Sequence, residues 1–102
     1  MRFLSLEKLI NLHDGYRQTI RIDALEVLMI QEAGQIHIIQ STCPHRGQRL
    51  EGGTVEDKVI YCPWHNFGFD LASGAHVGGV CDKLKVYAPI YENNVVGIMT
   101  DD

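Results

Sequence analysis

Short aliphatic and β-branched segments, separated by turn residues at intervals of about 8–12 residues, most constrain the fold of this chain. Gly34, Asp57 and the Asn93–Asn94 pair lie between such segments and predict tight connections between antiparallel strands. We therefore expect an all-β protein, either a sandwich or a small barrel. The expected strands cover residues 19–22, 25–31, 36–40, 54–56, 58–61, 67–71, 84–91 and 95–100. Residues 6–12 are expected to form one short helical turn that ends at His13-Asp14-Gly15.

Length and charge limit the possible functions. The 102 residues, without a repeat or a linker, predict a single domain over residues 1–102. A net charge of −4 argues against a nucleic-acid partner and suits transient docking to a basic protein surface. No stretch approaches the roughly 20 apolar residues that span a membrane, and the first residues do not resemble a secretory leader. We therefore expect a soluble, cytoplasmic protein.

Two loops interrupt the strand pattern, at about residues 42–50 and 62–70, and each contains Cys-Pro and a histidine. The first carries Cys43 and His45, the second Cys62 and His65, with sixteen residues between His45 and Cys62. Thiolate suits zinc and iron–sulfur clusters, and imidazole suits zinc and iron. The prolines stiffen both loops next to the cysteines. The loops therefore predict a preorganised site with four metal ligands.

The segment from Thr42 to Gly74 resembles the cluster-binding region of Rieske proteins. It reads C-P-H-R-G and then C-P-W-H-x-F-G-F-D-x-x-x-G. The resemblance implies a Rieske-type fold of stacked antiparallel sheets with a two-loop cluster-binding subdomain. It also implies a 2Fe–2S cluster in which Cys43 and Cys62 hold one iron and His45 and His65 hold the other. The rival interpretation is a structural zinc site with the same four ligands, although zinc sites usually group cysteines together and histidines together.

The resemblance also implies a reduction potential. Two ferric irons, two sulfides, two thiolates and two neutral imidazoles sum to zero charge, so this cluster accepts an electron more readily than a four-cysteine cluster does. High-potential Rieske proteins have a disulfide between the loops and two hydroxyl donors near the cluster. Gln48 and Trp64 stand at the disulfide positions, and Phe67 and Phe69 at the hydroxyl positions. We therefore expect a low potential, near or below zero (about −150 mV).

Several residues near the loops receive weaker predictions. Arg46, Gln48, Trp64 and Asn66 are expected to surround the outer histidines, with Trp64 either docking a partner or shielding the cluster. Gly47 and Gly68 are expected to let the backbone approach the metal centre closely. The segment Gly78-Gly79-Val80-Cys81 matches a third covering loop of the family but lacks its proline.

Other histidines and the third cysteine receive no role in the site. Cys81 is expected to be a small buried apolar residue rather than a fifth ligand. His13, His37 and His76 are expected to be surface residues or hydrogen-bonded polar residues.

The sequence leaves four functions open. The favoured one is an electron carrier, not an enzyme, resembling the ferredoxin component of ring-hydroxylating oxygenase systems. Its partners would be a flavin-containing NAD(P)H reductase and a terminal oxygenase. The first alternative is the small subunit of an assimilatory NAD(P)H nitrite reductase. An oxygenase Rieske domain fits less well, because a mononuclear iron site needs further ligands from another domain. The alternative of another class is a structural zinc-binding module.

Overall fold

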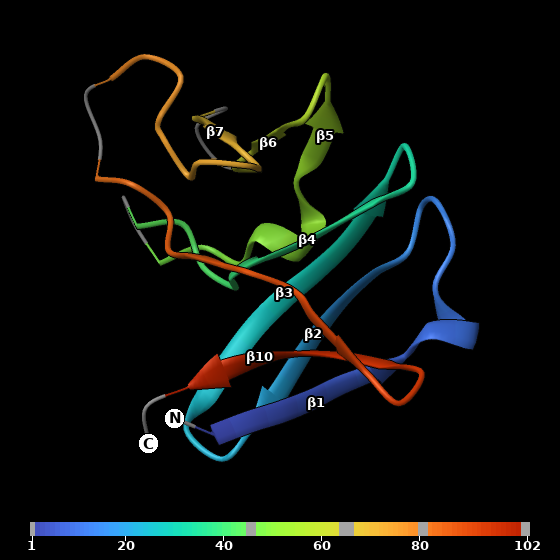
Figure 1. Ribbon diagram of the computed structural model, residues 1–102. Helices are drawn as coiled ribbons and strands as arrows, with labels where there is room; N and C mark the ends of the chain where they lie inside the picture. The colour runs from blue at the N-terminus through green and yellow to red at the C-terminus, as the bar shows by residue number, and fades with distance from the viewer. Residues whose placement is uncertain (1, 45–46, 64–66, 80–81, 101–102) are drawn as a thin grey trace.

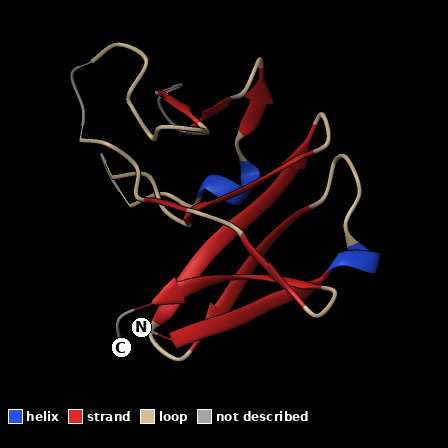
Figure 2. Ribbon diagram, in the orientation of Figure 1, coloured by secondary structure: helices blue, strands red, loops and turns tan. Residues whose placement is uncertain are grey.

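The computed structural model describes residues 2–44, 47–63, 67–79 and 82–100, which form three antiparallel sheets (Figures 1 and 2). The expected all-β class is confirmed, since the only helices among the described residues are two short 3-10 turns, η1 (Leu9–Asn11) and η2 (Leu50–Gly52). The first sheet has the order β1 (Arg2–Lys8), β10 (Val95–Thr100), β9 (Ile90–Glu92). The second has the order β2 (Arg17–Ile22), β3 (Leu25–Glu32), β4 (Gln35–Gln40), β8 (Val86–Tyr87). The third has the order β5 (Thr54–Glu56), β6 (Val59–Tyr61), β7 (Gly68–Asp70).

Strand β3 lies between two hydrophobic cores. Its residues Val27 to Ile30 are all buried, with at most 1% of their surface exposed. Since side chains alternate along a strand, Val27 and Met29 pack into a core with the first sheet, whereas Leu28 and Ile30 pack into a core with the third sheet. Figure 1 shows β3 running between these two parts of the molecule. Covering both faces explains why this strand is a continuous apolar run rather than an alternating one.

The predicted tight connections are confirmed. Positive φ angles occur at consecutive residues in three hairpin turns, which are Ala33–Gly34, Asp57–Lys58 and Asn93–Asn94. Two consecutive left-handed residues are typical of type I′ turns, whose twist matches that of antiparallel strands. These turns fix the register of β3–β4, β5–β6 and β9–β10.

Two sequence-based expectations about secondary structure were wrong in detail. Residues 6–8 belong to β1, which pairs with β10, so only the short η1 is helical in this region. The expected continuous strand over residues 84–91 is divided, because β8 pairs with β4 while β9 pairs with β10. Pro89 lies at this division, and proline cannot donate the backbone hydrogen bond that a continuous ladder requires.

Among the described residues, no helix has the length and apolar composition needed to cross a membrane.

Candidate metal centre

The first predicted loop begins directly after β4 and places Cys43 in the protein interior. Cys43 is 1% exposed, its N–H donates to the Gln48 carbonyl at 2.7 Å, and its carbonyl accepts from Gly47 N–H at 2.7 Å. Gly47 has a φ of +72° and open space around it, so glycine serves the turn here. The expectation that Gly47 permits a close backbone approach gains no support from its surroundings among the described residues.

The second predicted loop connects β6 to β7 and places Cys62 in the same core. Cys62 is 1% exposed and its N–H donates to the Phe67 carbonyl at 2.9 Å, which closes the loop at its base. Gly68 follows, and a Cβ there would collide with the ring of Tyr61 and with Val59. A larger residue at this position would therefore require the Tyr61 ring to shift, so glycine fits the close side-chain packing within the third sheet.

Both cysteines pack in one core, as the two-loop prediction requires. This core contains Cys43, Cys62 and the apolar residues Leu28, Ile30, Ile39, Leu50, Ile60, Phe69, Leu71 and Leu84. Cys43 and Cys62 are not joined by a disulfide. Two buried cysteines in one core fit the sulfur side of a cluster with mixed sulfur and nitrogen ligands.

The other predicted residues of the two loops cannot be placed in this way. His45 and His65 lie outside the described residues, as do Arg46, Trp64, Asn66 and Cys81. Within the described part of the chain, no group of three potential ligands forms another metal site.

Polar contacts fasten the chain that follows the first loop to the second sheet. Arg17 Nη1 donates to the carbonyl oxygens of Glu51 at 3.0 Å and Gly53 at 2.5 Å. Thr19 Oγ1 donates to the Glu51 carboxylate. No local feature of the sequence reveals this role, since Arg17 is one of two arginines in β2, the other being Arg21.

A turn after β7 is organised by Asp70. Its Oδ1 accepts hydrogen bonds from Ala72 N–H at 2.8 Å and Ser73 N–H at 3.0 Å, which lower the pKa of this carboxyl. The carbonyl of Asp70 accepts from Gly74 N–H at 2.7 Å, where Gly74 has a φ of +79°. These contacts explain the physical need for the D-x-x-x-G end of the motif.

His76 packs against the aromatic residues of the second loop. Its ring lies edge-on to Phe67 with centroids 5.2 Å apart, and tilted to Phe69 with centroids 5.4 Å apart. The two phenylalanines that replace hydroxyl donors therefore contribute packing, and Phe69 is fully buried. His13 is exposed, in agreement with the expectation for it.

His37 differs from the expectation, because it is neither on the surface nor fully hydrogen-bonded. It is 9% exposed, and its Nε2 has no hydrogen-bond partner among the described residues. Burial lowers the pKa of this imidazole and Lys58 lowers it further, while Asp70, Glu32 and the Leu71 backbone act in the opposite direction. His37 is therefore a neutral buried group.

This burial predicts acid sensitivity. As pH falls below about 6.5, the unfolded chain protonates position 37 before the native protein does, so stability is lost by up to about 1.4 kcal/mol per pH unit. We expect His37→Phe to flatten the dependence of the melting temperature on pH between about 7.5 and 5.5. Thermal melts of the holoprotein across this range measure the effect. The same substitution at exposed His13 serves as the control, and parallel profiles for wild type and His37→Phe would contradict the prediction.

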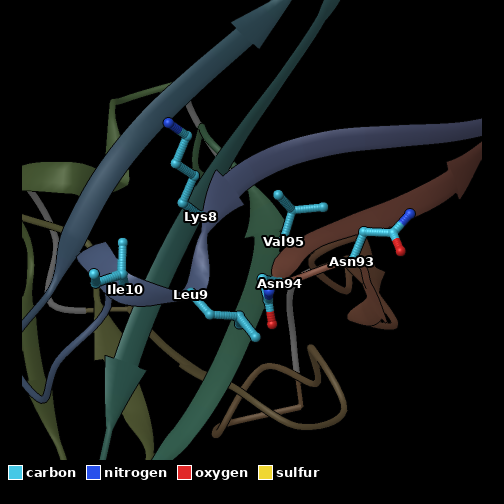
Figure 3. Close-up of a pocket in the computed structure, with 6 residues that line it drawn as sticks. All are labelled: Lys8, Leu9, Ile10, Asn93, Asn94 and Val95. Carbon is cyan, nitrogen blue, oxygen red and sulfur yellow. The ribbon is translucent and has the colours of Figure 1, made fainter.

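A cavity of about 510 Å³ lies away from the two loops. Its lining residues come from the end of β1 and η1 on one side and from the β9–β10 turn on the other (Figure 3). They are Lys8, Leu9, Ile10, Asn93, Asn94 and Val95. None of them is a cysteine or histidine, and none belongs to either predicted loop, so this cavity is separate from the candidate metal centre.

Comparison with known sequences supports the interpretation of the loops. The profile of the Rieske [2Fe–2S] domain matches residues 4–88. The ferredoxin component of the naphthalene 1,2-dioxygenase system of Pseudomonas putida is 28% identical over 75 residues, which is 72% of either chain. Apoptosis-inducing factor 3 of Homo sapiens is 28% identical over 64 residues, 63% of this chain, and the match spans only 11% of that longer protein.

Comparison with solved structures confirms the expected Rieske-type fold. A ferredoxin of Sphingomonas yanoikuyae B1 superimposes with a TM-score of 0.87 at 24% identity, covering 98% of this chain and all of that one. A chain from a complex of reduced oxygenase and oxidised ferredoxin in carbazole 1,9a-dioxygenase gives a TM-score of 0.82 at 22% identity, with coverages of 94% and 91%. A protein described as a nitrite reductase (NADPH) small subunit gives 0.82 at 19% identity, with coverages of 98% and 100%.

Proposed function

The chain belongs to the Rieske [2Fe–2S] domain family, and from this premise we propose that it is a one-electron carrier, the ferredoxin component of an oxygenase system. Family membership implies a Rieske-type 2Fe–2S cluster, which supplies reversible one-electron chemistry when bound. The observation that carries the proposal is the burial of Cys43 and Cys62 in one core, at the bases of two loops with the Rieske ligand pattern.

The ligand assignment is part of this proposal. Cys43 and Cys62 would hold the inner iron, because both are almost completely excluded from solvent. His45 and His65 would hold the outer iron, on the evidence of their positions in the two sequence motifs. Residues 42–50 and 62–70 would then be the cluster-binding loops of a single domain that extends over residues 1–102. The zinc alternative is disfavoured by the family match.

The partners follow from the relatives. Ferredoxin components of dioxygenase systems are among the similar proteins, and one similar structure comes from a complex of oxygenase and ferredoxin. We infer that this chain takes electrons from a flavin-containing NAD(P)H reductase in the cytoplasm and delivers them to a terminal oxygenase. Its net charge of −4 favours brief docking on a basic surface.

Electron transfer can be tested directly. Under anaerobic conditions, NAD(P)H and an oxygenase-system reductase are expected to bleach the visible absorbance of the oxidised protein. A terminal oxygenase added afterwards is expected to restore it, and added salt to slow both steps because docking is electrostatic. A protein that neither the reductase reduces nor the oxygenase reoxidises would overturn the proposal.

The small subunit of a nitrite reductase is the second candidate, supported by the structural match to a protein of that description. The two functions differ in the lifetime of the complex. Stable co-purification with a large reductase partner would favour the subunit, whereas rapid and salt-sensitive exchange would favour the carrier.

The reduction potential provides an independent prediction. Phe69 is fully buried in the same core as the cysteines and carries no hydroxyl group, and Phe67 likewise offers no donor. With fewer hydrogen bonds to its sulfur atoms, the reduced cluster, which carries more negative charge, is less stabilised. We expect a midpoint near or below zero, about −150 mV, in a redox titration followed by visible absorbance. A midpoint of about +200 mV or higher, in the upper part of the Rieske range, would contradict this expectation.

A further inference from the structure

Gln40, the last residue of β4, joins two segments that are far apart in the sequence. Its side-chain Nε2 donates to the Thr42 carbonyl at 2.7 Å, and its Oε1 accepts from Lys85 N–H at 2.6 Å. Its backbone N–H donates to the Lys85 carbonyl at 2.9 Å. One side-chain amide thus uses both of its polar ends, one toward the first cysteine loop and the other toward the segment that enters β8.

The contact with Lys85 marks the point where the β4–β8 ladder ends. In an ordinary hydrogen-bonded antiparallel pair, two residues exchange both backbone hydrogen bonds. Here Gln40 gives its backbone donor to Lys85, but the return bond from Lys85 N–H goes to the side-chain oxygen. The side chain therefore completes the pairing where the backbone of β4 turns away into the loop.

The contact with Thr42 lies beside a proposed cluster ligand. Thr42 and Cys43 share a peptide bond, so a donor that fixes the Thr42 carbonyl also fixes the orientation of the peptide that leads into Cys43. The N–H of that same peptide is held by the Gln48 carbonyl at 2.7 Å. The two contacts together determine how Cys43 leaves the end of the sheet.

The segment that contacts Gln40 from the other side returns from the third loop. Leu84 is 2% exposed and packs in the same core as the two cysteines, and its N–H donates to the Gly74 carbonyl at 2.8 Å. Figure 1 shows this returning segment beside the loop that follows β4. The position of the returning chain is thereby linked to the position of the first loop through one amide.

We propose that Gln40 is a positioning residue for the cluster. Its side-chain amide holds the Cys43 loop and the chain returning from the third loop in fixed relative positions. This inference rests on the proposed function, because it concerns the same metal centre. Gln40 contacts the protein frame of the site and acts on the cluster only through the Thr42–Cys43 peptide. The hydrogen bond to Thr42 is half-buried, which limits its exchange with water, whereas the one from Lys85 is exposed.

The test compares Gln40→Met with wild-type holoprotein. Methionine has similar length and shape but provides neither the donor nor the acceptor. We expect iron release from the reduced protein to ferrozine to become about tenfold faster, which corresponds to the loss of two ordinary hydrogen bonds. We also expect the EPR g values of the reduced cluster to shift, which general destabilisation remote from the cluster would not cause. Gln40→Glu keeps an oxygen facing Lys85 but replaces the donor to Thr42 by a carboxylate oxygen, which repels the Thr42 carbonyl. It is therefore expected to shift the g values and to speed iron release while the contact with Lys85 is kept.

A matched control is Gln31→Met. Gln31 lies in β3 and its Nε2 donates to Asp14 Oδ1 at 3.0 Å, so this variant loses a side-chain hydrogen bond without touching either cysteine loop. Wild-type g values and release rates are expected for it. Should Gln40→Met fail to fold, Gln40→Glu decides by the same two measurements.

Two outcomes overturn the inference. The first is that Gln40 variants retain wild-type g values and release rates within about twofold, and the second is that Gln31→Met shows the same changes as Gln40→Met. The proposed function fails in a different way, when wild-type protein carries the cluster but exchanges no electron with a reductase or an oxygenase. That result would leave the comparison of Gln40 variants intact.

Discussion

Cys43→Ser and Cys62→Ser are each expected to yield protein without the cluster, with iron and acid-labile sulfide reduced from about two of each per chain to near zero. Serine offers a hard oxygen that binds an iron–sulfur cluster poorly, and the described residues that share the core with the cysteines are apolar and offer no substitute ligand. Iron and sulfide analysis together with the EPR spectrum of the reduced protein measures the loss. The loss should be complete for either substitution, because the inner iron would keep only one of its two thiolate ligands.

Cys81→Ser is the control for this experiment. It makes the same chemical change at the third cysteine of the chain, which stands outside both ligand motifs. We expect it to retain iron, sulfide and the EPR signal. Full cluster content in Cys43→Ser, or cluster loss in Cys81→Ser alone, would show that the ligand assignment is wrong. A wild-type protein that contains one zinc and no sulfide would instead establish the zinc module.

Gly53→Ala is expected to destabilise the fold by about 1–3 kcal/mol or more, whereas Gly52→Ala changes stability by less than about 0.5 kcal/mol. A Cβ at Gly53 would collide with the backbone carbonyl of Tyr61, which cannot rotate away as a side chain would. A Cβ at Gly52 meets nothing within 4 Å. Gly53 also accepts a hydrogen bond from Arg17, so any displacement of its backbone loosens the anchor of the first loop.

Thermal melts of the two holoproteins measure this difference. For a domain of this size, each 1 kcal/mol lowers the melting temperature by roughly 4–8 °C. We expect the transition of Gly53→Ala to fall by at least this amount and that of Gly52→Ala to stay near wild type. Equal melting temperatures for the two variants would mean that the β5–β6 pair can shift to admit a methyl group, and that the close approach at Gly53 has little effect on stability.

The sequence predicted the sheet elements well where turn chemistry was strong. Asp57 and Asn93–Asn94 were correctly placed in turns, because few residues adopt left-handed backbone readily and these types do so more than most. The prediction from sequence failed for β1, because the residues near the N-terminus show no pattern that distinguishes a strand from a helical turn. The partner of β1 is β10, at the other end of the chain. The division between β8 and β9 was also missed, although Pro89 was a visible signal.

The metal centre was predicted from motif spacing, whereas the residues that support it were not. Cys43 and Cys62 carry a pattern that stands out in the sequence, and the structure places both in one core. Gln40 and Arg17 act through contacts with residues distant in the sequence. Gln40 contacts Lys85, and Arg17 contacts Glu51 and Gly53. A glutamine or an arginine in a strand has no local property that reveals such a partner. The expectation for His37 was wrong for the same reason, because residues distant in the sequence, among them Lys58 and Asp70, lie near this buried imidazole.

The burial of β3 on both faces has a consequence for how the protein unfolds. Val27 and Met29 belong to one interior, and Leu28 and Ile30 belong to the other, so neither half has a complete interior without this strand. A fragment with only the cysteine loops and their small sheet would expose the apolar surface that Leu28 and Ile30 normally cover. We therefore expect that the metal-binding half does not fold on its own, and that heat or denaturant melts both halves of the protein in one cooperative step.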